Sequence, residues 1–231
     1  MAVTDTLASS VNALSFAPPV TYVYNPLVYA RDAHAKYVKK YARSNVVLWV
    51  GMNPGPFGMA QTGVPFGDVT MVRDFLRIKG KLANLPLQHP KRPIEGFDCP
   101  RSEVSGTRLW GYAKDQFLTP AAFFKQFYVV NYCPLVFMGE TGKNITPDKL
   151  PGAEREALFK YCDLALRKVA QAINARFALG VGAFAKGACE RALNGLDIPV
   201  GQILHPSPAS PAANRGWAEA AHKQLKKLEL V

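Results

Sequence analysis

Short runs of β-branched and aromatic residues alternate along this chain with longer segments in which apolar residues recur every three or four positions. The short runs predict buried strands at residues 46–50, 127–130, 177–181 and 199–204. The longer segments predict helices. These are residues 7–16, 31–43, 69–78, 107–127 with a break at Thr119-Pro120, 150–175, 183–193 and 212–230. Strands that alternate with helices in this way predict a parallel sheet with helices on both faces.

The expected fold class is therefore α/β, a three-layer sandwich with a central, mostly parallel four-stranded sheet flanked by helices. A chain of 231 residues that is 48% apolar is typical of one compact domain, so we expect a single domain over residues 1–231. Residues 1–20 are expected to be a loosely ordered or helical N-terminal extension, and residues 22–29 to be irregular. Residues 79–106 contain four prolines and predict a long loop, which is typically functional or mobile.

A polar side chain follows three of the predicted strands. The first strand runs into a loop rich in glycine and proline that carries Asn53, the second ends at Asn131, and the last ends at His205. Taken singly, each asparagine is typical of a turn and the histidine of a structural residue. Ligand sites of parallel sheets lie beyond the carboxyl ends of the strands, so the three together favour a convergent site.

The composition favours a nucleic-acid partner for that site. The chain has 28 lysines and arginines against 17 aspartates and glutamates, a net charge of +11, which attracts polyanions. An asparagine side chain offers a donor and an acceptor side by side, so Asn131 would donate to O4 of uracil and accept from N3–H. Phe66 would stack on the base, although a phenylalanine between Pro65 and Gly67 can also simply fill the loop. A base in a duplex would have to be flipped out.

Other site classes find little support in the sequence. The four cysteines form no C-x-x-C pair and the four histidines no H-E-x-x-H, so we expect buried free thiols, no metal and no cofactor. The segment 139–144 does not fit a phosphate-binding P-loop, and no dinucleotide-binding G-x-G-x-x-G occurs. No apolar run reaches about 18 residues and no secretory signal is evident, which predicts a soluble intracellular protein without membrane attachment.

Residues 51–67, GMNPGPFGMAQTGVPFG, closely resemble the first motif of the single-strand-selective monofunctional uracil-DNA glycosylases, a branch of the uracil-DNA glycosylase superfamily. Residues 131–135 (NYCPL) and 205–208 (HPSP), the latter continuing to 214–217 (NRGW), resemble its other signatures. Residues 89–93 (HPKRP) and 102–106 (SEVSG) are also similar. The resemblance covers about residues 25–220 and implies a uracil-DNA glycosylase-like fold.

The resemblance implies a role for each matching residue. Asn53 would position the attacking water, and His205 would stabilise negative charge on O2 of the departing base. The residues implied in base binding are Met52, Gly55, Met59, Phe66 and Asn131. The motif has no lysine that would form a Schiff base, so hydrolysis without strand cleavage is expected, as the initiating step of base excision repair. Because Asn53 is an amide, it can orient water but cannot deprotonate it.

Small residues from Gly55 to Met59 imply room beside C5 of a pyrimidine. The resemblance therefore implies activity on uracil and 5-hydroxymethyluracil, with xanthine and hypoxanthine as further candidates. The expected partners are single- and double-stranded DNA that contains a damaged base, bound by a monomer, in the cytoplasm with the nucleoid of a bacterium or in the nucleus of a eukaryote.

The residues expected to contact DNA are Lys91, Arg92, Ser207, Pro208, Ala209, Ser210, Asn214 and Arg215. At Ala209 and Ser210 the sequence departs from the family, which usually has arginine and then asparagine in the wedge that enters the helix. An alanine cannot fill the vacated stack, so we expect weaker activity on duplex relative to single strands than a member with an arginine wedge would show.

The sequence alone leaves three alternative functions open. A non-catalytic module that binds damaged bases or single strands would share the charge and the aromatic residues, but would not need Asn53 and His205 at strand ends. A phosphate-loop enzyme such as a nucleotidase would need acidic metal ligands near its loop, and only Asp68 is close. The iron–sulfur branch of the same superfamily would need clustered cysteines.

Overall fold

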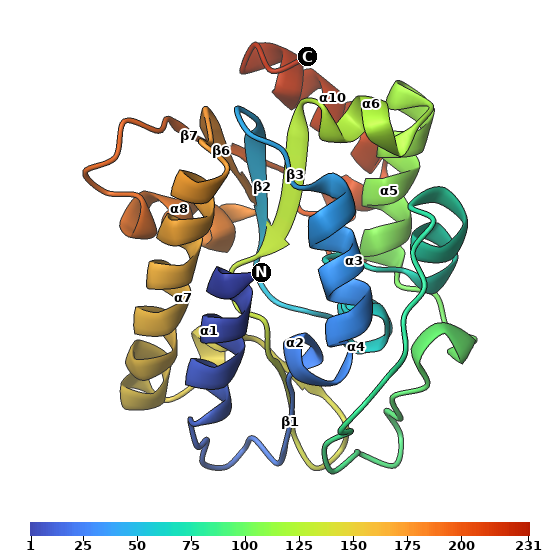
Figure 1. Ribbon diagram of the computed structural model, residues 1–231, viewed down its shortest axis with the longest axis vertical. Coiled ribbons are helices and arrows are strands. Elements are labelled where there is room, and N and C mark those ends of the chain that lie inside the picture. The colour runs from blue at the N-terminus through green and yellow to red at the C-terminus, as the bar shows by residue number, and fades with distance from the viewer.

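The computed structural model describes residues 1–231 and contains a four-stranded parallel sheet at its centre (Figure 1). The strand order is β3 (Phe127–Asn131), β2 (Val47–Gly51), β6 (Phe177–Val181) and β7 (Val200–Ile203). Every neighbouring pair is parallel. All four strands begin and end within one residue of their predicted bounds, and the predicted fold class is confirmed.

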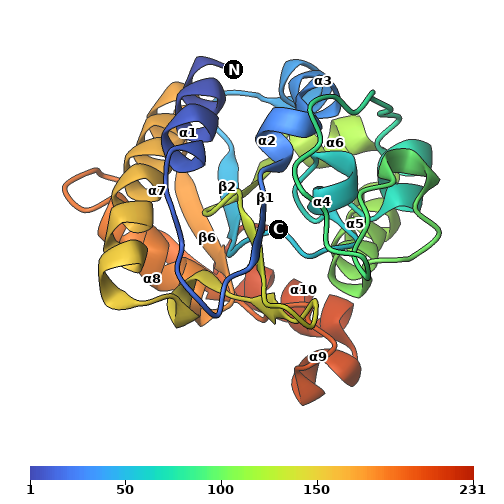
Figure 2. The same ribbon diagram turned by 90° about the horizontal axis from the view of Figure 1, so that it is seen from below.

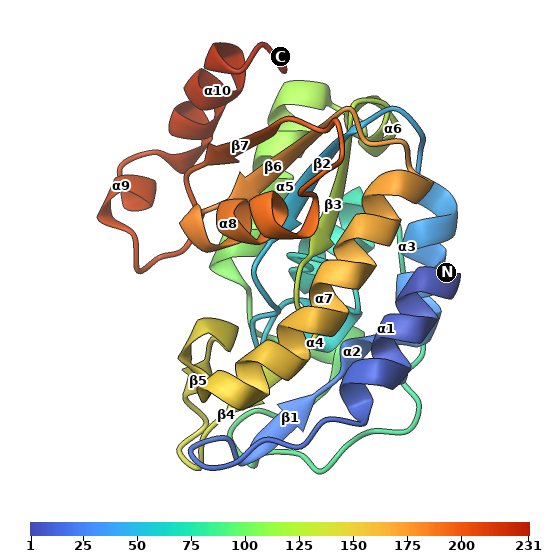
Figure 3. The same ribbon diagram turned by 90° about the vertical axis from the view of Figure 1, so that its left-hand side faces the viewer.

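Helices cover both faces of this sheet (Figures 1 and 3). On one face α7 (Gly152–Ala172) packs against α8 (Ala183–Ala192) and against α1 (Ala2–Asn12), which lies alongside it (Figure 2). On the other face lies α5 (Val104–Phe117), which packs against α6 (Pro120–Phe124) and α10 (Trp217–Lys227). The remaining helices are α2 (Pro26–Tyr29), α3 (Arg31–Tyr41), α4 (Met59–Thr62) and α9 (Pro211–Asn214). None of the helices is long and apolar enough to cross a membrane.

A second, antiparallel sheet was not predicted. It consists of β1 (Tyr22–Tyr24), β4 (Val136–Met138) and β5 (Asn144–Ile145), in the order β1-β4-β5. The expectation that residues 22–29 are irregular was wrong, since they form β1 and α2. Strands of two or three residues are too short to show the alternation of polar and apolar positions that identifies a strand.

Several helix bounds also differ from the predicted ones. The N-terminal helix is Ala2–Asn12 rather than 7–16, so the extension is helical and packed rather than loosely ordered. The helix expected at residues 69–78 is shorter in the structure, where Met71–Phe75 form a π-helical turn. Asp68 Oδ1 accepts a hydrogen bond from the Met71 N–H (3.0 Å) and so caps the N-terminal end of this segment. The C-terminal helix is interrupted at Gly216, whose φ of 133° excludes helical geometry.

The core holds the strand ends in place. All five residues of β2 are buried, and the Trp49 ring lies 5.9 Å from Phe123 and 5.4 Å from Phe127, edge to face with both. At the free edge of β3, Tyr37 Oη donates to the Val129 carbonyl (2.8 Å) from α3. β3 is thereby held by β2 on one edge and by α3 on the other, which places its carboxyl end beside that of β2.

Candidate active site

A small polar cavity lies at the carboxyl ends of β2, β3 and β7, with about 280 Å³ of empty space including its open mouth. Nine residues line it: Asn53, Pro54, Gly55, Met59, Phe66, Glu103, Ser105, Asn131 and His205. The structure thus brings together both residues predicted to be catalytic and four of the five predicted to bind the base. Met52 is the exception, because it does not line the cavity. Its carbonyl accepts from the Cys133 N–H (2.9 Å) and prolongs the pairing of β2 with the segment after β3.

Asn53 presents an acceptor to the cavity. Its Nδ2 donates to the Leu135 carbonyl (3.2 Å) and weakly to the Pro54 carbonyl (3.4 Å). Both partners are carbonyl oxygens, so they fix which end of the amide is the nitrogen. No protein group donates to Asn53 Oδ1, which leaves this oxygen to accept a hydrogen bond from water or a ligand.

Gly51 lets Asn131 and Phe66 meet over the end of β2. Gly51 pairs with Asn131 in the register of the two strands, and a Cβ at position 51 would lie 2.5 Å from both Asn131 Oδ1 and Phe66 Cε2. Phe66 has a positive φ of 52° and is held by Trp110 Nε1, which donates to its carbonyl (3.0 Å). The nearby Gly106 is needed for the same reason, since a Cβ there would collide with the Phe66 carbonyl.

The Asn131 amide is only weakly engaged within the protein. Its Nδ2 donates to the thioether sulfur of Met59 (3.3 Å), a poor acceptor. A ligand carbonyl would be a better partner than this sulfur for Asn131 Nδ2.

The hydrogen bond made by His205 sets its tautomer. The Ser207 N–H donates to His205 Nδ1 (3.0 Å), so in the neutral ring the proton is on Nε2. Burial lowers the pKa of His205 below its usual value of 6.5. At neutral pH the ring is therefore a neutral donor through Nε2. Its centroid lies 6.2 Å from that of Phe66.

Glu103 is a cavity residue that the sequence analysis did not single out. It precedes α5 and caps it, with Oε2 accepting from the Gly106 N–H (3.1 Å). Burial, with a smaller contribution from Asp68, raises the pKa of Glu103 to about 7. Ser105, the second residue of the same helix, also lines the cavity, and its hydroxyl makes no hydrogen bond to the protein. The only sequence signal for Glu103 is its place three residues before Gly106 in the familial segment 102–106, where an N-terminal cap fits.

The loop after His205 is shaped by its own polar side chains. Ser207 Oγ accepts from the Ala209 N–H (3.1 Å), and Ser210 Oγ accepts from the Ala213 N–H (3.3 Å) as the cap of α9. Asn214 Nδ2 donates to the Pro208 carbonyl (2.9 Å). These three side chains therefore brace the loop, and their contact with DNA stays a prediction.

The other residues of this loop face solvent. Pro208, Ala209 and Arg215 are exposed, and α9 stands out from the body of the molecule (Figures 2 and 3). Arg108 was missed by the sequence analysis. It reaches across from α5 and donates to the Pro206 carbonyl (3.0 Å) and to Asn214 Oδ1 (2.9 Å), which fixes the loop to the domain.

The predicted basic segment 89–93 lies beside the first motif. His89 is buried and its Nε2 donates to the Glu140 carbonyl (2.8 Å), so the long loop is anchored at this point. The Arg92 guanidinium lies 5.3 Å and that of Arg101 4.3 Å from the ring centre of Phe57, four residues after Asn53. Lys91 is exposed next to them. Positive charge is thereby gathered around Phe57, two residues after the cavity-lining Gly55.

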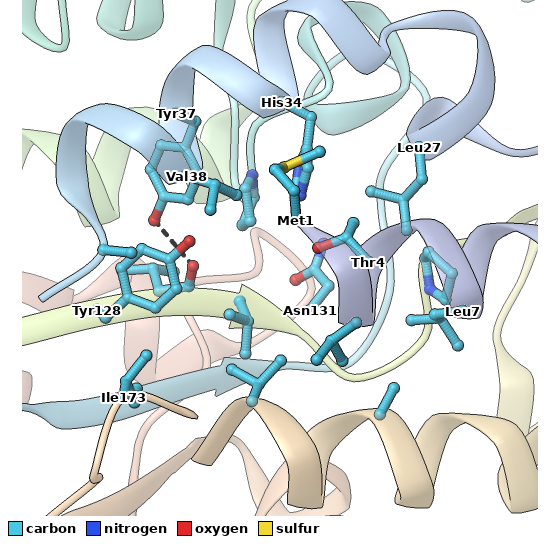
Figure 4. Close-up of a pocket in the computed structure, with 18 of the residues that line it drawn as sticks. Met1, Thr4, Leu7, Leu27, His34, Tyr37, Val38, Tyr128, Asn131 and Ile173 are labelled. Atoms are coloured by element: carbon cyan, nitrogen blue, oxygen red, sulfur yellow. Dashed lines mark hydrogen bonds between the residues drawn. The ribbon is translucent and has the colours of Figure 1, made fainter. Parts of the chain in front are cut away.

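A second cavity, mostly apolar, adjoins the polar one, and Figure 4 shows the residues that line it. It holds about 920 Å³ of empty space, again including its open mouth, and is lined by residues of α1, α3, α7 and β3, with Tyr37, His34 and Leu7 among its walls. Asn131 and Met59 line both cavities, so these two side chains form the partition between them. Burial lowers the pKa of His34 to about 4, and its Nδ1–H donates to the Gly63 carbonyl (2.8 Å), so it is a neutral structural residue.

Comparison with known proteins gives close relatives over nearly the whole chain. The chain is 47% identical over 228 residues to the single-strand selective monofunctional uracil-DNA glycosylase of Rattus norvegicus, covering 97% of this chain and 82% of that protein. The proteins of the same name from Mus musculus and Bos taurus are each 46% identical, with 97% of this chain and 82% and 84% of theirs covered.

The solved structures agree on the fold. The crystal structure of SMUG2 from Pedobacter heparinus superposes with a TM-score of 0.68 at 19% identity, over 98% of this chain and 97% of that one. No protein-family model matches the sequence.

Proposed function

The chain belongs to the family of single-strand selective monofunctional uracil-DNA glycosylases, and from this premise we propose that it hydrolyses the N-glycosidic bond of uracil in DNA and so initiates base excision repair. The observation that carries the proposal is the shared cavity at the strand ends. An acceptor for water (Asn53), a reader of the pairing edge (Asn131), a stacking ring (Phe66) and a neutral donor (His205) all line it.

Each of these side chains has a step in the proposed reaction. A flipped base lies against Phe66, and Asn131 gives up its contact with Met59 to donate to O4 and accept from N3–H of uracil. Cytosine presents the opposite pattern and is rejected. Asn53 Oδ1 holds the attacking water, and the Nε2–H of His205 donates to O2 as negative charge develops on the leaving base. One such donor is worth on the order of 10²–10³ in rate.

The proposed substrate range depends on the residues of the cavity wall that would lie beside C5 of a bound pyrimidine. Gly55 lacks a side chain, and Met59 is flexible, so the site accommodates 5-hydroxymethyluracil as well as uracil. Xanthine and hypoxanthine are the further substrates to test.

The test uses a single-stranded oligonucleotide with one central uracil, treated with alkali after incubation. The wild-type protein is expected to give alkali-dependent cleavage, and Asn53→Ala and His205→Ala to lose it by about a hundredfold or more. A matched control is His222→Ala, which removes a partly buried histidine of α10 outside the cavity, with stability measured in parallel. Binding of the oligonucleotide without any alkali-labile product, on all four candidate bases, would favour the non-catalytic binding module instead.

Strand preference depends on the exposed loop. Ala209 is exposed on the segment between His205 and α9, and its methyl group cannot replace a flipped base in the stack. We therefore expect a lower ratio of duplex to single-strand activity than in a member with an arginine wedge. Installing Ala209→Arg is expected to raise the duplex to single-strand activity ratio, and an unchanged ratio would contradict this role for the loop.

A further inference from the structure

We propose that Glu103 is a further catalytic residue of this site, the carboxylate that accepts the proton of the attacking water. The inference rests on the proposed glycosylase function and goes beyond it, since that function was argued from Asn53, Asn131, Phe66 and His205 alone.

Asn53 and His205 leave the attacking water without a proton acceptor. Water that attacks C1′ must lose a proton, and the Asn53 amide has no basic atom to take it. The cavity contains two titratable side chains, Glu103 and His205. His205 Nδ1 already accepts from the Ser207 N–H and its Nε2 carries a proton, so the neutral ring has no free basic nitrogen. Glu103 supplies the only carboxylate that lines the cavity.

The position of the Glu103 side chain is fixed from several sides. Its backbone N–H donates to Asp68 Oδ2 (3.0 Å), and its Oε2 accepts from the Gly106 N–H (3.1 Å). A Cβ at Gly55 would lie 3.2 Å from Oε1, and one at Gly58 would lie 2.6 Å from Oε2, so the carboxylate lies along the glycine-rich loop that follows Asn53. No protein group donates to Oε1. One oxygen therefore anchors the side chain, and the other is free for the water.

The surroundings make this carboxylate an effective base. Burial disfavours its charged form and the negative charge of Asp68 adds to the effect, so its pKa is raised to about 7. A proton acceptor works best when its pKa is near the working pH. In its ionised form Glu103 also places a negative charge beside the sugar, where positive charge develops as the glycosidic bond breaks.

The step balances with the groups present. The bond between C1′ and the base nitrogen breaks, and its electron pair leaves with the base as an anion stabilised by His205. The oxygen of the water forms the new bond to C1′, and its proton passes to Glu103. The neutral carboxylic acid then returns the proton to the departing base or to solvent, which restores the carboxylate.

The test is a single-turnover pH–rate profile between pH 5.5 and 9 on uracil-containing single strands. Glu103→Gln is the informative variant, because its amide oxygen can still accept from the Gly106 N–H and cap α5. The wild-type rate is expected to rise about tenfold per pH unit below pH 7 and to level off above it. Glu103→Gln is expected to lose about a hundredfold at pH 8 and to lose the rise, with unchanged affinity for an oligonucleotide containing an uncleavable analogue.

The control is Glu95→Gln, the same chemical change at an exposed glutamate outside the cavity, which should keep the wild-type profile. Glu103→Asp, with a displaced carboxylate, is expected to be slower but to keep a pH-dependent rise. A Glu103→Gln rate within threefold of wild type, or a loss that is matched by lost affinity for the analogue, would overturn the proposal. An inactive wild-type protein would instead overturn the proposed function, so the two failures are distinguishable.

Discussion

Replacing Glu103 by glutamine is expected to stabilise the protein above neutral pH while it slows the reaction. The carboxylate lies in a cavity whose walls disfavour its charge, so its pKa is about 7 in the folded protein against 4.5 for an ordinary glutamate. A folded-state pKa above the unfolded one means that the folded protein binds the proton more tightly. The free energy of unfolding of the wild type therefore falls as pH rises through the window from 4.5 to 7.

The size of the effect follows from the two pKa values. The difference corresponds to on the order of 3 kcal/mol of stability lost by the wild type once Glu103 is fully ionised. Glutamine carries no charge, and its amide oxygen can still accept from the Gly106 N–H. The free energy of unfolding of the variant therefore does not fall in this way as pH rises. The stability gain of Glu103→Gln over wild type should be small at pH 4, grow by roughly 1.4 kcal/mol per pH unit through the window, and be constant above pH 7.

The assay is urea unfolding of both proteins at pH 4, 5, 6, 7 and 8, followed by tryptophan fluorescence. Only the difference between the proteins is compared, because other groups titrate in both. Glu103→Ala serves as a control that removes both charge and cap, and it should gain about 1 kcal/mol less than glutamine at every pH. A difference between wild type and Glu103→Gln that does not change with pH would refute the argument that burial raises the pKa of this group.

Further predictions concern two glycines, Gly51 and Gly111, and the basic residues Lys91 and Arg92. Gly51→Ala would place its Cβ 2.5 Å from both Asn131 Oδ1 and Phe66 Cε2, so excision of uracil should fall by at least about tenfold even where the variant folds. Gly111→Ala, in the interior of α5 with no atom within 4 Å of the new Cβ, should instead raise stability by about 0.5–1 kcal/mol in the same urea assay. Replacing both Lys91 and Arg92 by alanine should reduce the magnitude of the slope of log binding constant against log salt concentration by up to about 2. Lys160→Ala on α7 should leave that slope unchanged. An unaltered slope in the double variant would place the DNA path elsewhere.

Much of the site could be predicted from the sequence because its signals are local. The central strands are continuous apolar runs, and their bounds were right to within one residue. Asn131 is the last residue of β3, while Asn53 and His205 each follow their strand by two residues, so a parallel sheet brings them to one rim. The long motif at 51–67 carried the family resemblance, which the relatives at 46–47% identity confirm.

The sequence is ambiguous where a local pattern has several structural outcomes. In the loop after His205, the side chains of Ser207, Ser210 and Asn214 bond to backbone groups of that loop, and their expected contact with DNA stays a prediction. Short polar residues compete for nearby backbone groups, and sequence alone does not decide between such a bond and an intermolecular one. Met52 does not line the cavity because its backbone extends the strand pairing, and its role in base binding stays a prediction.

The sequence by itself determined the layered α/β architecture, the net positive charge and the placement of three polar residues at strand ends, because hydrophobic period and chain order are properties of neighbouring residues. Only the tertiary structure decided which other groups share the cavity. Glu103 meets Gly55 and Gly58 across nearly fifty positions of chain, and its raised pKa arises from that burial. The same holds for Arg108, which braces a loop about a hundred residues away. Contacts of this kind depend on how helices pack on the sheet, and no local pattern encodes that packing.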